Sequence, residues 1–240
     1  MLLLSITDIN RRMIYLKEDM KMHTELQMTF NELYERCIYS SIAHAAANLR
    51  FPFFSYEQSW DGDNFSFKPD SEGTISFDFE KRIIAGAIID NESPRLAQYP
   101  KHQAIELFSE APDNIKQLAD MEALQYLLFE IEGIVLPVAT TAFWLDSEGL
   151  SIFDDSIDEF WKNGGEFIRY LLGPFGELKE YLKDYSDLST EETALIEHLF
   201  DMKMKGNLLI TKKDLSGVDK KSEGYDEFME SLAELGFIFE

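Results

Sequence analysis

Cysteine and long apolar runs are both scarce in this chain. Cys37 is the single cysteine among 240 residues, so no disulfide can form within the chain. The lack of a second cysteine excludes a disulfide-stabilised framework and favours a reducing compartment, so we expect a cytoplasmic protein. No run approaches the about 20 apolar residues needed to span a bilayer. The apolar start, Met1–Ile6, is too short for a signal peptide.

Basic residues are also few. The chain has 22 Lys and Arg against 45 Asp and Glu, a formal net charge of -23. Nucleic-acid phosphates and anionic lipid headgroups repel so negative a surface, which argues against both as partners and favours a basic one. Acidic disordered chains lack aromatic and large aliphatic residues. This chain is 45% hydrophobic with 19 Phe, so we expect it to fold.

Motifs for catalysis, metal binding and cofactor binding are missing from the sequence. The histidines are isolated from one another and from Cys37, without metal-ligand spacing. No GxSxG or GxGxxG fingerprint is present. We therefore predict no metal and no cofactor, and we favour a non-enzymatic protein. A hydrolase or transferase with a dispersed site remains an alternative.

Hydrophobic periodicity predicts the fold class. Residues 24–49 carry apolar side chains at helical spacing, which predicts one long amphipathic helix. The period then changes to two, and turn residues separate four predicted strands at 54–60, 64–67, 74–80 and 82–90. The last of these is apolar on both faces, as expected for a strand covered on both sides. Four short strands with short turns predict an antiparallel meander.

Helical spacing returns at 104–108 and 113–128, and residues 134–145 and 150–153 look extended around a turn at 147–149. We predict an α+β fold with an antiparallel sheet of about five or six strands. The long N-terminal helix and further helices pack on this sheet. The predicted divisions are a loosely attached extension at 1–21, an α+β domain at 22–186 and a small helical C-terminal segment at 187–240. The last segment is either separate or part of the same domain.

Aromatic residues followed by acids at predicted turns form the candidate binding site. Trp60 precedes one pair of acids and Trp144 another, and a third acidic group follows the second pair. The candidate residues are Trp60, Asp61, Asp63, Trp144, Asp146, Glu148, Asp154, Asp155, Asp158 and Glu159. Partner-binding patches commonly combine aromatic anchors with complementary charge. The competing interpretation places the tryptophans in the core, with the acids as solvated neighbours.

These features lead to a functional hypothesis. We expect an acidic binding protein that docks a basic protein partner, most concretely an immunity or antitoxin-like inhibitor of a basic toxin. Long-range attraction would speed the encounter, and desolvated aromatic side chains would slow release. An acidic DNA mimic is the alternative, with residues 154–197 as a source of phosphate-like carboxylates. The sequence predicts neither the partner's identity nor the oligomeric state.

Overall fold

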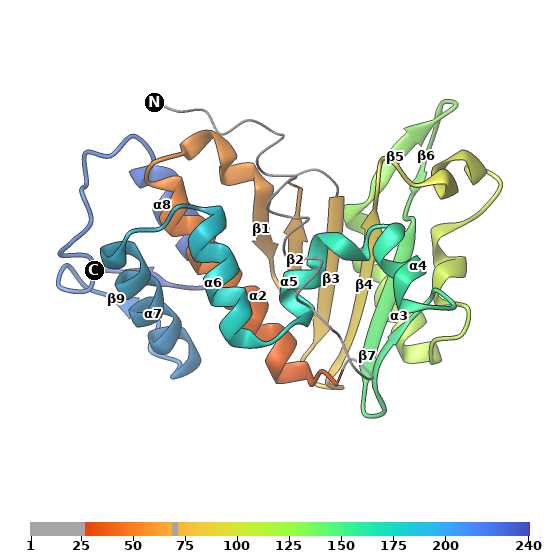
Figure 1. Cartoon of the computed structure of the whole chain (residues 1–240), viewed down its shortest axis with the longest axis horizontal. Coiled ribbons are helices and arrows are strands. Elements are labelled where there is room, and N and C mark those ends of the chain that lie inside the picture. The colour runs from red at the N-terminus through yellow and green to blue at the C-terminus, as the bar shows by residue number, and fades with distance from the viewer. Residues whose placement is uncertain (1–26, 69–71) are drawn as a thin grey trace.

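The computed structural model describes residues 27–68 and 72–240, and a six-stranded antiparallel sheet forms its centre (Figure 1). The strands lie in the spatial order β1-β2-β3-β4-β7-β8. Their bounds are β1 Gln58–Asp61, β2 Asn64–Phe67, β3 Glu72–Asp78, β4 Ile83–Ile89, β7 Thr141–Asp146 and β8 Gly149–Ile152. The predicted α+β fold with an antiparallel meander is confirmed.

Both faces of the sheet are buried, because side chains alternate between two hydrophobic clusters. On β4, Ile84 and Ile88 belong to the larger cluster, whereas Ala85 and Ala87 belong to the smaller one. Successive residues of a strand point to opposite faces, so a strand covered on both sides must be apolar at every position. This explains the continuous apolar sequence of β4 and confirms the prediction made for it.

The long N-terminal helix, α2 (Phe30–Asn48), packs in the larger cluster. It begins at Phe30 rather than at the predicted residue 24. The Thr29 side chain accepts a hydrogen bond from the Glu32 backbone N–H, and the Glu32 carboxylate accepts one from Thr29 in return. This capping box satisfies two backbone donors and fixes the start of the helix. Residues 24–26 and the predicted extension at 1–21 lie outside the described residues.

The C-terminal half supplies most of the remaining helices on the α2 side of the sheet (Figure 1). They are α4 Ile157–Lys162, α5 Arg169–Leu172, α6 Phe175–Tyr185, α7 Thr190–Met204 and α8 Tyr225–Glu234. Two short parallel strands, β9 Leu209–Ile210 and β10 Ile238–Phe239, complete this part. Leu199 of α7 and Phe228 of α8 share one hydrophobic cluster with Leu33 of α2. The helices of residues 187–240 therefore pack directly on the N-terminal helix.

The chain between β4 and β7 covers the opposite face of the sheet. It contains η2 Pro94–Gln98, η3 Ala104–Phe108, α3 Asp113–Met121, η4 Ala123–Tyr126, β5 Leu128–Ile131 and β6 Ile134–Pro137. The predicted helix to residue 128 is therefore too long. Glu132 and Gly133 both have positive φ, at 54° and 80°. This matches the two-residue turns that suit hairpins, and β5 pairs with β6 in a separate projecting hairpin (Figure 1).

The segment before β1 also differs from prediction. Residues 54–60 were expected to form a strand, but residues 52–57 form the 3-10 helix η1 (Pro52–Glu57) and the strand starts only at Gln58. Pro52 stands in the first turn of η1, where its fixed φ and missing N–H are tolerated. No residue of η1 is buried.

Candidate functional site

Three turns of the sheet meet at one of its ends. β1 and β2 are joined through Asp61 and Asn64, which pair directly, and Asn64 also pairs with Ser76 near the end of β3. Asp78 pairs with Ile83 across the β3–β4 turn, and Asp146 pairs with Gly149 across the β7–β8 turn. Because Ile84 lies opposite Leu145, this last turn belongs to the same end. It is the lower end of the sheet in Figure 1.

We call the residues of these three turns, 61–64, 78–83 and 146–149, the acidic sheet end. Six acids stand in it against two bases; the acids are Asp61, Asp63, Asp78, Glu80, Asp146 and Glu148. Phe79 lies among them with 42% of its surface exposed. Both bases have partners of their own. Lys81 pairs with Asp78 at 3.0 Å, and Arg82 donates to Asn31 and lies over the Phe30 ring.

Electrostatic perturbation shows that neighbouring carboxylates interact at this end. The pKa of Asp63 is raised by burial, and then by the negative charges of Glu122 and Asp78. The pKa of Asp78 is lowered, mainly because its carboxylate accepts a hydrogen bond from the Lys81 backbone N–H. Glu234 of α8 has a raised pKa through burial, with further contributions from Glu230 and Asp61. The negative potential therefore extends from the acidic sheet end onto α8.

The structure places four of the predicted site residues along this end, with the β3–β4 turn between the two pairs: Asp61, Asp63, Asp146 and Glu148. Sequence reasoning missed Asp78, Phe79, Glu80 and Glu122 as their neighbours. The first three lie at the β3–β4 turn, and the available signal was their position at the end of the predicted strand 74–80, directly before the next predicted strand. Glu122 follows α3, and only the tertiary packing places it beside Asn64, whose side-chain amide donates to it at 3.1 Å.

The two predicted aromatic anchors are core residues instead. Trp60 is 8% exposed; its indole N–H donates to the Ser41 hydroxyl at 2.8 Å, and its ring stacks on Phe77. Trp144 is 6% exposed and lies in the smaller hydrophobic cluster. Each follows the alternation of its strand and points into a face of the sheet. Both side chains are buried, as the competing interpretation expects, and neither is available as an exposed anchor.

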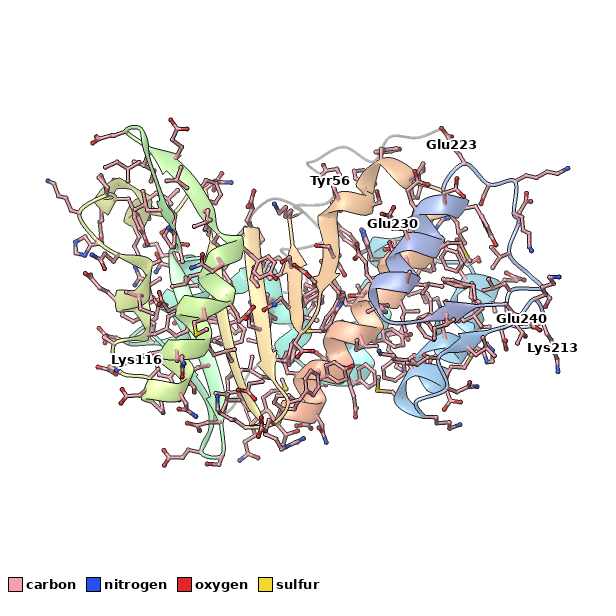
Figure 2. All side chains as sticks on the ribbon, turned by 180° about the vertical axis from the view of Figure 1, so that it is seen from behind. Tyr56, Lys116, Lys213, Glu223, Glu230 and Glu240 are labelled. Carbon is pink, nitrogen blue, oxygen red and sulfur yellow. The ribbon has the colours of Figure 1, made fainter. Side chains whose placement is uncertain are left out.

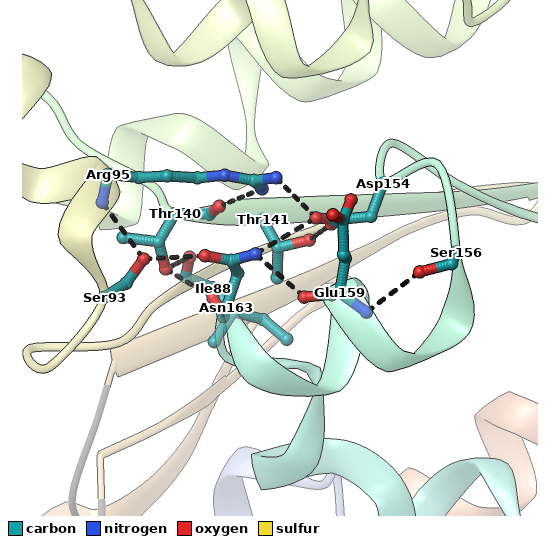
Figure 3. A network of polar contacts seen from close by, with 9 residues as sticks. All are labelled: Ile88, Ser93, Arg95, Thr140, Thr141, Asp154, Ser156, Glu159 and Asn163. Carbon is teal, nitrogen blue, oxygen red and sulfur yellow. Dashed lines mark hydrogen bonds and ion pairs between the residues drawn. The ribbon is translucent and has the colours of Figure 1, made fainter.

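Asp154, also predicted for binding, is buried in a polar network (Figure 3). Its carboxylate pairs with the Arg95 guanidinium at 2.6 Å and accepts hydrogen bonds from Thr141 and from the Asn163 amide. These partners come from η2, β7 and the end of α4. Buried charges are tolerated when paired and hydrogen-bonded, so Asp154 joins three elements and is not presented to a partner.

The remaining predicted residues, Asp155, Asp158 and Glu159, are exposed at the start of α4. Ser156 caps this helix, and its hydroxyl accepts a hydrogen bond from the Glu159 backbone N–H (Figure 3). Acids in a first helical turn are favoured by the helix dipole. Asp158 and Glu159 thus suit the start of this helix. All three residues stand apart from the acidic sheet end because β8 leads the chain away from it.

A small cavity lies between α2, β1 and α8. Its volume is about 10 Å³, which fits a single water molecule. His44, Ser41, Trp60 and Glu234 contribute to its wall, and His44 Nε2 is buried without a hydrogen-bond partner. Burial lowers the pKa of His44 to about 4, against hydrogen bonds with the backbone of Ser55 and Phe54. This cavity has room for solvent but not for a substrate.

Within residues 27–68 and 72–240, no three His, Cys, Asp or Glu side chains form a group that could hold a metal ion. Cys37 is fully buried, and burial raises the pKa of its thiol well above the ordinary value, which keeps it protonated. No helix in the same part of the chain is both long and apolar enough to cross a membrane. The chain matches no protein-family model, no curated protein and no solved structure.

Proposed function

We propose that this protein binds a basic protein partner through the acidic sheet end, in the manner of an immunity or antitoxin-like inhibitor. One observation carries the proposal: three separate turns bring six acids and the exposed Phe79 to one end of a rigid sheet. The overall charge of -23 supports it, because long-range attraction accelerates the approach of a basic protein.

The rigidity of this surface favours binding. Hydrogen-bonded strands hold all three turns, so the backbone that carries these carboxylates is ordered before a partner arrives. Among the described residues, no ion pair joins Asp63, Glu80 or Glu148 to a cation of this chain. A partner's Lys or Arg side chains would meet these carboxylates without displacing an internal ion pair, and Phe79 would offer apolar area between them.

Affinity capture at low salt from the native host, with the full chain as bait, tests this proposal. The triple variant Asp63→Asn, Glu80→Gln, Glu148→Gln removes three exposed charges from the acidic sheet end. A matched variant, Glu110→Gln, Asp120→Asn, Glu180→Gln, removes three exposed charges elsewhere. A basic protein should be retained by the natural chain and by the matched variant, and lost from the acidic-end variant.

Two results would count against the proposal. If both triple variants lose the partner equally, net charge alone is responsible and the acidic sheet end is no binding site. If several unrelated DNA-binding proteins are captured and DNA displaces them all, the chain is a DNA mimic. An inhibitor should instead abolish the activity of one captured partner at equal molar amounts.

A further inference from the structure

Four exposed aromatic residues of the described chain lie together on and beside η1. They are Phe51, Phe53, Phe54 and Tyr56, and we call them, with η1, the aromatic platform. Phe53 and Tyr56 are each 65% exposed. The Phe53 and Phe54 ring centroids are 4.3 Å apart, and both rings contact Phe51. None of the four is among the buried or partly buried side chains of the two hydrophobic clusters.

Exposed aromatic clusters on soluble proteins commonly mark interaction sites, since water contact with so much apolar surface is unfavourable. The aromatic platform differs in place from the acidic sheet end. η1 leads into the start of β1, whereas the acidic sheet end follows the last residue of β1.

The backbone beneath the platform is fixed. The Phe51 N–H donates to Ala47 at the end of α2, and the Glu57 carbonyl accepts from the Lys68 N–H after β2. A backbone held in this way needs little further ordering on binding.

A stripe of acids on α8 borders the platform. Asp226, Glu230 and Glu234 are exposed and spaced four residues apart, so they follow one face of the helix. The Glu234 carboxylate accepts a hydrogen bond from the Trp60 N–H of β1 at 3.0 Å, which turns this face toward β1 and η1. Figure 2 shows Glu230 on α8 and Tyr56 on η1 at the same side of the molecule.

Two bases beside the platform have carboxylate partners outside this stripe. Arg50 forms an ion pair with Glu192 at 2.9 Å, and Lys68 forms one with Glu72 at 3.5 Å. Arg50 also places its guanidinium 5.0 Å from the centroid of the Phe51 ring. Within this chain, then, an arginine already stacks on the platform while it pairs with a carboxylate.

From these contacts we propose that the aromatic platform and the α8 stripe bind an arginine-bearing segment of another protein. The segment's apolar side chains and guanidinium planes lie on the rings, and the guanidinium groups pair with Asp226 and Glu230. Arginine suits this surface better than lysine, because its planar group stacks on aromatic rings and forms paired hydrogen bonds with a carboxylate. The inference shares with the proposed function the assumption that the partner is a basic protein. It does not depend on binding at the acidic sheet end.

Charge distinguishes this occupant from two others. In a symmetric dimer built on the platform, the acidic stripes of both copies would face the same interface and repel one another. A membrane surface with anionic headgroups would be repelled by the same stripe. A basic protein segment is the one occupant for which the rings and the charges are both complementary.

Fluorescence anisotropy with labelled helical peptides tests this inference on the full chain. The probe is a peptide of about four helical turns with Leu on one face and Arg on the other. One comparison peptide has Lys for Arg, and a second has Ser for Leu. The platform variant is Phe53→Ser with Tyr56→Ser. The control is Ile134→Ser with Val135→Ser, which alters similarly exposed side chains on β6.

We expect the Arg–Leu peptide to bind the natural chain and the control variant equally. The platform variant should bind it about tenfold or more weakly. The peptide with Lys for Arg should bind the natural chain more weakly than the Arg–Leu peptide, and so should the peptide with Ser for Leu. The acidic-end variant Asp63→Asn, Glu80→Gln, Glu148→Gln should bind the peptide with an affinity within about twofold of that of the natural chain. This small loss reflects only the weaker long-range attraction after three charges are removed. That pattern would support the platform as a site whether or not the acidic sheet end binds a partner.

Other results would overturn the inference. If the platform variant binds the Arg–Leu peptide as tightly as the natural chain does, only non-specific charge attraction remains. The same holds if the Lys and Ser peptides bind as tightly as the Arg–Leu peptide. Loss of binding in the acidic-end variant alone would favour the proposed function and reject the platform. Sedimentation that shows a dimer dissociated by Phe53→Ser with Tyr56→Ser would identify a second copy as the occupant. Vesicle binding lost in that variant would identify a membrane.

Discussion

Protonation of His44 should destabilise the folded protein in mildly acidic solution. His44 is largely buried between α2 and η1, and its pKa falls from 6.5 to about 4 mainly because burial disfavours the charged ring. Between pH 6.5 and pH 4 the unfolded chain binds a proton that the folded chain does not. Lowering the pH through this window therefore favours the unfolded state, and the full stabilisation is present only above pH 6.5.

The size of the effect follows from the shift. Each unit of pKa corresponds to about 1.4 kcal/mol, so the shift of His44 from 6.5 to about 4 amounts to about 3.5 kcal/mol at most, and most of it develops above pH 4. Many carboxylates titrate in the same range, so the chain must be compared with a His44→Gln variant, which keeps a polar side chain without a titrating ring. Urea unfolding of both proteins at several pH values between 7.5 and 4 isolates the contribution of His44.

The stability difference between the natural chain and His44→Gln should shift by about 3 kcal/mol over this range, to the disadvantage of the natural chain at low pH. A difference that stays constant with pH would refute the reasoning. It would mean that protonated His44 finds compensation, for which Glu234 on the wall of the same cavity is the nearest candidate. Repeating the series with Glu234→Gln then identifies that ion pair.

Two further predictions concern stability. Gly86→Ala should lower the free energy of unfolding by about 1–3 kcal/mol in urea, because the new methyl group overlaps the Phe143 ring. The control Gly176→Ala, in open space on α6, should be neutral or stabilising. Equal effects of the two variants would contradict the packing argument. Asp154→Ala should cost about 3 kcal/mol or more, because it leaves the Arg95 guanidinium without its carboxylate. A cost below about 1 kcal/mol would show that water replaces the lost contact.

Much of the sheet could be predicted from the sequence, since its signals are local. Alternation and turn residues separated β2, β3 and β4, and the doubly apolar β4 was correctly expected to be covered on both faces. The same alternation failed at residues 54–57. There, Phe54 and Tyr56 imitate one face of a strand, but Pro52 starts a 3-10 turn and both side chains remain exposed. Periodicity could not distinguish a buried face from an exposed platform.

The candidate site was less predictable, because it depends on strand register and packing. The sequence predicted acids at turns between strands. Strand register explains why Asp63 and Glu148 lie at one end of the sheet despite 84 intervening residues. The burial of Asp154 could not be foreseen, since Arg95 lies far away in sequence and meets it only in the folded chain. Tryptophan beside acids was an unreliable sign of exposure, because strand alternation determines where the ring points.

The association rate between the chain and its captured basic partner, measured by stopped flow at increasing salt, tests the electrostatic account most directly. The natural chain and the matched variant Glu110→Gln, Asp120→Asn, Glu180→Gln should show a fast rate that falls steeply as salt rises. The variant Asp63→Asn, Glu80→Gln, Glu148→Gln should associate more slowly and with a shallower salt dependence. Identical rates and salt slopes for all three proteins would contradict a steering role for the acidic sheet end.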